Sequence, residues 1–272
     1  MTIKQKIHER LPFIAEKLGM SVEEILEKLP HLKMDADPIA LPNMSEDVDP
    51  LTLSVYIDHT VLKPMIQKQG IVDLINDAKK HNFKAVCVNG CWAEFCKDEL
   101  EGTGIMVASV IGFPLGAMTP SAKVGEITEL VGRVEVDEID MVLNIGQLLD
   151  GNLRYVYDEI EVCHAATEDK CLKVIFECGA ISKECIIDAS IICALIGVGF
   201  VKTSTGFGYG GALPEDVELM KQCVAERCEV KASGGVRSPV DAVKMINLGA
   251  TRIGTSSGKK IIAVDVAPAT GY

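Results

Sequence analysis

Two short runs, Gly199-Phe-Val-Lys-Thr-Ser204 and Glu229-Val-Lys-Ala-Ser-Gly234, give the clearest fold signal in the chain. Each run is rich in β-forming residues, is too short for a typical helix and contains one lysine. A glycine-rich turn follows each run, and after the second turn Pro239–Leu248 has helical periodicity. This order of strand, turn and helix is the repeating unit of parallel α/β proteins.

Six further runs of the same kind extend this rhythm along the chain, with helical periodicity between them, as in Ala122–Val136 and Leu153–Thr167. The six runs are Ser54–Asp58, Ala85–Asn89, Met106–Phe113, Glu138–Asn144, Leu172–Cys178 and Thr251–Thr255. Eight such units without a break in composition predict one α/β domain, a closed (β/α)8 TIM barrel, over residues 51–272. A doubly wound open sheet is the structural alternative, but the first run lacks the glycine-rich dinucleotide turn that such sheets usually carry.

The first fifty residues have a different pattern, which predicts two amphipathic helices. Gly19 should end the first helix, and Ser21 with Glu24 forms a capping-box pattern at the start of the second. A linker with several prolines then leads to the barrel. We therefore predict that residues 1–50 form a helical extension, which covers part of the core domain or a partner subunit. The apolar stripe of the first helix is Ile3, Ile7, Leu11, Ile14 and Leu18.

The composition is that of a globular protein and disfavours two classes of partner. Hydrophobic residues make up 48% of the 272 residues and charged residues 24%. The net charge of −12 argues against a nucleic-acid surface, which needs clustered lysine and arginine, but it leaves a small anionic substrate open. No stretch approaches the roughly 20 apolar residues that span a bilayer, and the N-terminus lacks the features of a signal peptide. We therefore expect no membrane partner and a cytoplasmic location.

The cysteines and histidines give no clear metal signature. Ten cysteines are spread through the chain, several within apolar runs, and are best interpreted as reduced thiols. A zinc site at Cys87, Cys91 and Cys96 is the less favoured alternative, because their spacing lacks a second pair. Only His59 of the five histidines lies near a predicted strand end, so a metal-dependent mechanism is disfavoured. We expect no metal and no organic cofactor.

Lys202 and Lys231 are the sharpest candidates for chemistry, because lysine is rarely buried inside a strand without a partner. If both ammonium groups point into one cavity, they repel each other, and one loses its proton more easily. A neutral amine near neutral pH can attack a carbonyl group. In the alternative interpretation, each lysine forms only a structural ion pair with Asp140, Asp58 or Glu177.

Glycine-rich turns follow the last three predicted strands, at residues 203–211, 232–237 and 254–258. Glycine allows the backbone to approach a ligand closely, and serine and threonine hydroxyls with free N–H groups suit phosphate oxygens. Barrel enzymes often bind phosphate after strands seven and eight. The turns therefore predict a phosphate site, although each turn alone could be a simple strand-to-helix connection.

From about Leu51 to Gly258, the chain resembles the class I deoxyribose-phosphate aldolases. Seven motifs, in the family's order, carry the resemblance. They are Ile57-Asp-His-Thr-Val-Leu-Lys-Pro64, Ala85-Val-Cys-Val-Asn89, Val110-Ile-Gly-Phe-Pro-Leu-Gly116, Glu138-Ile-Asp-Met-Val-Leu-Asn144, Phe200-Val-Lys-Thr-Ser-Thr-Gly-Phe207, Val230-Lys-Ala-Ser-Gly-Gly-Val-Arg237 and Thr251-Arg-Ile-Gly-Thr-Ser-Ser-Gly258. Gly90 departs from the proline that many members carry, and the extension of about fifty residues exceeds the short bacterial members.

The resemblance implies roles for residues that match the family's motifs. Lys202 matches the Schiff-base lysine, Lys231 the second lysine that perturbs it, and Asp140 the acid–base aspartate that works with a water. The C-terminal Tyr272 is similar to a tail tyrosine that assists proton transfer in some members. The other substrate-binding residues that we predict are Asp58, Thr60, Cys87, Thr205, Gly206, Gly234, Gly235, Arg237, Ser256 and Ser257.

The implied activity is reversible cleavage of 2-deoxy-D-ribose 5-phosphate to D-glyceraldehyde 3-phosphate and acetaldehyde, in deoxyribose catabolism. The family also implies a homodimer or a higher homo-oligomer. Two alternatives remain: another Schiff-base sugar-phosphate aldolase, and a degenerate homologue that acts as a scaffold or binding protein.

Overall fold

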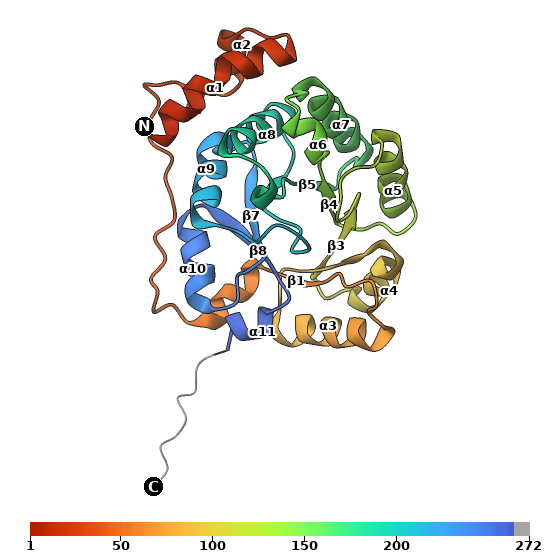
Figure 1. Ribbon diagram of the computed structural model, residues 1–272. Coiled ribbons are helices and arrows are strands. Elements are labelled where there is room, and N and C mark those ends of the chain that lie inside the picture. The colour runs from red at the N-terminus through yellow and green to blue at the C-terminus, as the bar shows by residue number, and fades with distance from the viewer. Residues whose placement is uncertain (264–272) are drawn as a thin grey trace.

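Eight parallel strands form a closed barrel in the computed structural model, which describes residues 1–263 (Figure 1). Neighbouring strands pair in chain order, and β1 pairs with β8, with Ile57 opposite Ile253, to close the barrel. The strands are β1 (Ile57–Val61), β2 (Ala85–Asn89), β3 (Met106–Ile111), β4 (Glu138–Val142), β5 (Cys171–Ile175), β6 (Phe200–Lys202), β7 (Glu229–Ser233) and β8 (Ala250–Thr255). The predicted barrel is thus confirmed, and the open-sheet alternative is excluded.

Helices follow the strands in sequence and surround the barrel (Figure 1). They are α3 (Lys68–His81), α4 (Gly90–Leu100), α5 (Pro120–Gly132), α6 (Ile145–Leu149), α7 (Leu153–Ala166), α8 (Lys183–Ile196), α9 (Pro214–Val224), α10 (Pro239–Asn247) and α11 (Gly258–Ile261), with a short 3-10 helix η3 (Cys178–Ala180) before α8. Of the helices that the structure describes, none is long and apolar enough to cross a membrane.

Alternation along the strands separates an apolar layer from a charged interior. On β4, Ile139 and Met141 belong to the main hydrophobic core. Their neighbours Glu138 and Asp140 are also buried, and their side chains meet those of β5 and β8 inside the barrel. Because side chains of a strand point to opposite faces in turn, Glu138 and Asp140 both carry their charges into the barrel.

The N-terminal extension packs on the barrel's own helices. It contains α1 (Ile3–Leu18), α2 (Val22–Lys28) and the 3-10 helix η1 (Pro30–Leu32). Gly19 ends α1 in a left-handed conformation, and Ser21 with Glu24 forms the predicted capping box of α2. The apolar stripe of α1 lies against α7, α8 and α9, so the extension covers part of the core domain.

Several predicted strand limits were wrong, and two of these errors concern the candidate ion-pair residues Asp58 and Glu177. Residues 54–56 belong to a 3-10 helix, η2 (Pro50–Tyr56), because Asp49 accepts a hydrogen bond from the N–H of Leu51 and a proline occupies the first helical position. Asp58 is therefore the second residue of β1 and not its last. The fifth strand ends at Ile175, and Glu177 lies beyond it with a left-handed backbone (φ 55°).

Candidate active site

Seven charged side chains from six strands meet inside the barrel, and each residue is at most 5% exposed. Four of them are cations and three are carboxylates, so the fully ionised cluster carries one excess positive charge. Because a buried positive charge without a counter-ion is unfavourable, this excess favours the loss of one proton. The cluster consists of Asp58, Glu138, Asp140, Lys173, Lys202, Lys231 and Arg252.

Asp140 lies at the centre of this cluster. Its Oδ2 accepts hydrogen bonds from the ammonium groups of Lys202 and Lys231, both at 2.7 Å, and its Oδ1 accepts one from Lys173 at 2.8 Å. Burial alone would raise the pKa of Asp140, but the charges of Lys173, Lys202 and Lys231 outweigh burial and hold the pKa well below its usual value. Asp140 is therefore an ionised carboxylate.

Three of the four cations have additional carboxylate partners. Lys231 lies 2.5 Å from Asp58 Oδ2, Lys173 lies 2.6 Å from Glu138 Oε2, and Arg252 contacts both of these acids. Burial lowers the pKa of each cation, but the carboxylates more than compensate and raise all three values. These three side chains remain charged, as the ion-pair interpretation of Lys231 expects.

Lys202 is the cation that loses its proton most easily. Its only ion pair among the described residues joins it to Asp140. Burial, helped by the charge of Lys231, outweighs the attraction of Asp140 and lowers the pKa of Lys202 below its ordinary 10.5. The pKa of Lys202 is therefore shifted in the direction that the two-lysine hypothesis predicts, whereas Lys231 stays charged in its ion pairs with Asp58 and Asp140.

A cavity of about 510 Å³ opens above Lys202 at the C-terminal ends of the strands. Lys202 is the only member of the charged cluster that lines it. The exposed side chains of Lys63 and Arg237 also line the cavity, whereas no aspartate or glutamate does among residues 1–263. In a protein with a net charge of −12, this local excess of cations suits an anionic ligand.

Most of the predicted substrate contacts line this cavity. They are Thr60, Thr205, Gly206, Gly234, Gly235, Arg237, Ser256 and Ser257. Asp58 and Cys87 do not line it, because both are completely buried below its floor. The Cys87 thiol lies 4.0 Å from Asp140 Oδ2, and burial raises its pKa to about 11, so the thiol is neutral. Tyr272 lies outside the described residues.

The turns after β6 and β7 touch each other beside the cavity. A Cβ atom on Gly211 would lie 2.4 Å from the carbonyl oxygen of Gly234, so only glycine fits at this contact. Gly235 has a left-handed backbone (φ 81°), which favours glycine. Residues of all three predicted glycine-rich turns line the cavity, and the turns after β6 and β7 also contact each other.

Three charged residues of this site, Lys173, Glu138 and Arg252, were not predicted from the sequence. Lys173 lies within the apolar run Leu172–Ile175, which is the same signal that singled out Lys202 and Lys231. Glu138 precedes Asp140 by two residues and so shares its strand face. Arg252 had no such signal, because only the closure of the barrel brings β8 within reach of Glu138.

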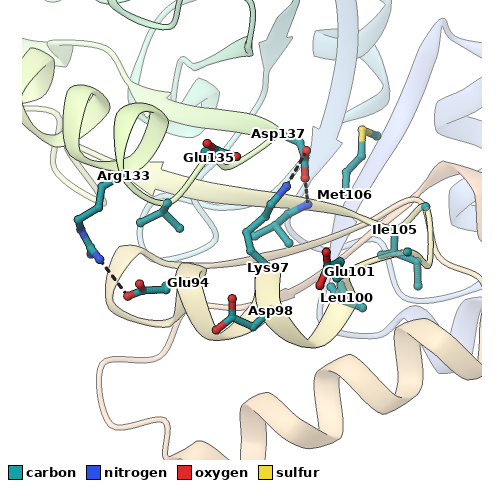
Figure 2. A pocket seen from close by; sticks show the side chains of 14 residues that line it. Glu94, Lys97, Asp98, Leu100, Glu101, Ile105, Met106, Arg133, Glu135 and Asp137 are labelled. Carbon is teal, nitrogen blue, oxygen red and sulfur yellow. Dashed lines mark hydrogen bonds and ion pairs between the residues drawn. The ribbon is translucent and has the colours of Figure 1, made fainter.

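A second cavity, of about 580 Å³, lies at the opposite end of the barrel, where β3 and β4 begin (Figure 2). Its cations are already engaged by neighbouring acids: Lys97 lies 3.0 Å from Asp137, and Arg133 lies 3.0 Å from Glu94. Most of the ionic side chains around it are at least partly exposed, whereas the seven buried charges lie at the other cavity. The candidate active site is therefore the cavity above Lys202.

The fold and the site define a (β/α)8 barrel enzyme, with a buried lysine of lowered pKa and a cationic, glycine-rich rim at the C-terminal ends of its strands. The chain belongs to the DeoC/LacD family of aldolases, whose model matches residues 52–263.

Named relatives agree with this membership. A deoxyribose-phosphate aldolase of Staphylococcus haemolyticus is 48% identical over 207 residues, which cover 76% of this chain and 94% of the relative. The deoxyribose-phosphate aldolase of Streptococcus uberis is 45% identical over 212 residues, which cover 78% of this chain and 96% of the relative.

Solved structures agree as well. A candidate deoxyribose-phosphate aldolase from Coccidioides immitis is 33% identical, has a TM-score of 0.80 and matches 88% of this chain and 94% of its own. The tetrameric deoxyribose phosphate aldolase of Aeropyrum pernix is 26% identical and has a TM-score of 0.71. The match covers 89% of this chain and 97% of that structure's chain.

Proposed function

We propose that this protein is a class I aldolase that reversibly cleaves 2-deoxy-D-ribose 5-phosphate to D-glyceraldehyde 3-phosphate and acetaldehyde. One observation carries the proposal: Lys202 is the only member of the buried charged cluster that lines the cavity, and it is the cation whose pKa is lowered. A lysine that reaches the substrate and releases its proton is what Schiff-base chemistry requires. The names of the relatives supply the substrate class.

In the proposed reaction, the neutral amine of Lys202 attacks the aldehyde carbon C1 of the open-chain sugar. The carbinolamine loses water to give an iminium ion, which withdraws electrons from the neighbouring C2–C3 bond. Removal of the proton from the C3 hydroxyl breaks this bond, releases glyceraldehyde 3-phosphate and leaves an enamine. Protonation of the enamine at C2 and hydrolysis of the iminium then free acetaldehyde and Lys202.

Asp140 is the proposed general acid–base group, and Lys231 the residue that lowers the pKa of Lys202. Asp140 contacts the nitrogen of Lys202 but does not line the cavity, so a water between it and the substrate is the simplest route for the proton. Lys231 stays charged because Asp58 and Asp140 both stabilise its ammonium group. Its fixed charge therefore favours the neutral amine of Lys202 before the attack on the aldehyde.

The phosphate of the substrate is proposed to bind at the glycine-rich turns after β6, β7 and β8. The cavity wall there offers hydroxyl groups of Ser256 and Ser257 and the cations Lys63 and Arg237. Fixing the phosphate uses binding energy from a remote group to hold C1 next to Lys202. Asp58 and Cys87, which lie below the cavity floor, would act on the substrate only through the groups that they contact.

We further propose that the enzyme works in deoxyribose catabolism, in the cytoplasm, as a homo-oligomer. All ten cysteines are free, which fits a reducing compartment. The Aeropyrum pernix relative is described as tetrameric, and this supports an oligomer without fixing the number of subunits here.

Steady-state cleavage assays test the proposal. The wild type should cleave 2-deoxyribose 5-phosphate, and Lys202→Leu should lose turnover while its circular dichroism spectrum stays unchanged. Lys244→Leu, at an exposed position on α10, is the matched control and should remain active. An active Lys202→Leu variant would contradict the mechanism. A wild type that cleaves only other sugar phosphates would favour a different Schiff-base aldolase, and an inactive wild type would favour the scaffold alternative.

A further inference from the structure

Glu177 is a buried acid next to the candidate site, and the proposed mechanism gives it no role. It follows β5 with a left-handed backbone and is only 3% exposed. Its Oε2 accepts hydrogen bonds from the backbone N–H of Thr205, at 3.2 Å, and from the Thr205 hydroxyl. No ion pair joins Glu177 to a cation within residues 1–263, and its Oε1 is buried without a hydrogen-bond partner.

These contacts connect the segment after β5 to the glycine-rich turn after β6. The hydroxyl oxygen of Thr205 accepts a hydrogen bond from the N–H of Phe207, at 3.0 Å, so the Glu177 contact continues into the turn. The N–H of Cys178 donates to the carbonyl of Thr203 at 2.8 Å. The turn is therefore held by hydrogen bonds from Glu177 and from the residue that follows it.

The two segments also pack too closely for any side chain between them. A Cβ atom on Gly179 would lie 2.1 Å from the carbonyl oxygen of Tyr209. The turn therefore packs directly on the segment after β5, and the side chain of Glu177 holds it there by hydrogen bonds to Thr205.

Glu177 acts on the cavity only through this turn. It does not line the cavity, whereas Thr205, Gly206 and Phe207 all do. A buried carboxylate without a paired cation is unfavourable unless hydrogen-bond donors surround it. For Glu177 these donors are the backbone N–H and the hydroxyl of Thr205. The position of those turn groups is thus coupled to the charge of Glu177.

We propose that Glu177 is a positioning residue that sets the shape of the phosphate-binding turn, and so determines the preference for a phosphorylated sugar over the free sugar. This inference rests on the proposed function, because it assigns the turn to the substrate phosphate. Glu177 touches neither the reacting carbons nor Lys202, so formation of the Schiff base itself should not depend on it.

The test compares Glu177→Gln and Glu177→Ala with the wild type. For 2-deoxyribose 5-phosphate we expect KM to rise about tenfold or more, since a lost charged hydrogen bond costs roughly 1.4 kcal/mol or more, which corresponds to a factor of ten. The kcat/KM for unphosphorylated 2-deoxyribose should change little. Glu215→Gln, an exposed acid at the start of α9, is the control and should match the wild type.

A second pair of variants covers the case in which the Glu177 variants do not fold. Thr205→Val removes the hydroxyl and should behave like Glu177→Ala, whereas Thr205→Ser keeps the hydroxyl and should restore most of the preference. Equal losses with both sugars would overturn the inference, because they would indicate a general structural role. An unchanged KM for the phosphorylated sugar would overturn it as well.

Two further measurements separate this inference from the proposed function. The affinity for inorganic phosphate, measured by calorimetry, should fall in the Glu177 variants, whatever reaction the enzyme catalyses. Reductive trapping of acetaldehyde on Lys202 should be unaffected in them. A wild type that fails to cleave the sugar would refute the proposed function, and the phosphate affinities would still decide the role of Glu177.

Discussion

Lys202 and Lys231 are register partners on β6 and β7, and their ammonium nitrogens donate to the same carboxylate oxygen at equal distances of 2.7 Å. They differ in their other partners: Lys231 has Asp58 within 2.5 Å, whereas Asp140 alone pairs with Lys202 in the described structure. Both ammonium groups pair with the negative charge of Asp140, but only Lys231 has a second carboxylate, Asp58, that stabilises its charged form. This asymmetry is the central feature from which the proposed chemistry follows.

Removal of the second lysine should shift the pH–rate profile. The charge of Lys231 lowers the pKa of Lys202, so Lys231→Met should raise that pKa and leave less neutral amine. The rising limb of kcat/KM should then move to higher pH, and activity at neutral pH should fall at least about tenfold, since each pH unit is a factor of ten in amine. Lys231→Arg keeps the charge and should shift the limb less. An unmoved limb in Lys231→Met would refute this electrostatic role.

Acid should unfold the protein partly through Asp58. Burial opposes ionisation of Asp58, but Lys231, Arg252 and Lys173 lower its pKa from 3.8 to about 2. A depressed folded-state pKa contributes stability that is complete above about pH 4 and is lost as the pH falls toward 2, here about 2 kcal/mol. Urea unfolding on both sides of this window measures the change. A free energy of unfolding that stays constant across the window would contradict the assigned ion pairs.

The N-terminal extension should stabilise the barrel through one ion pair. Arg10 on α1 donates from Nε and Nη2 to the two carboxylate oxygens of Asp188 on α8, at 2.8 and 2.7 Å. Arg10→Met leaves this buried carboxylate unpaired and should lower the free energy of unfolding by about 1–3 kcal/mol, with aldolase activity retained. Adding Asp188→Asn should recover part of the loss, because a neutral amide is less costly to bury. Equal stability of Arg10→Met and wild type would show that the extension is not held by this pair.

The contact between the β6 and β7 turns should be sensitive to a single methyl group. In Gly211→Ala, the new Cβ would meet the carbonyl oxygen of Gly234 at 2.4 Å and push the two turns apart. We expect a higher KM for the phosphorylated sugar and a loss of about 1–3 kcal/mol in stability. Gly125→Ala on α5 has no atom within 4 Å of its Cβ and should be neutral or stabilising by about 0.5–1 kcal/mol. Identical kinetics of Gly211→Ala and wild type would refute the role of this contact.

The sequence predicted the barrel and most of the cavity wall because these depend on local signals. Strand runs, helical periodicity and glycine-rich turns each occupy a few consecutive residues, and the order of the units then implies the closed sheet. Lys202 and Lys231 could be recognised in the sequence because a lysine within a predicted buried strand is unusual.

The remaining features depend on contacts between distant segments. Arg252 and Glu138 are 114 residues apart, and only barrel closure reveals that they pair. The burial of Asp58 below the cavity floor follows from its partners Lys231 and Arg252, which periodicity cannot identify. Glu177 has a left-handed backbone and contacts the turn after β6. The local sequence does not show this contact, so the end of β5 at Ile175 could not be predicted from it.

Reductive trapping shows which lysine forms the Schiff base. The protein is incubated with acetaldehyde and borohydride, and the modified residue is located by peptide mass spectrometry. The Schiff-base mechanism requires an ethyl group on Lys202 and none on Lys231, whose ammonium group is held by two carboxylates. An adduct on Lys231, or no adduct on the folded protein, would contradict it.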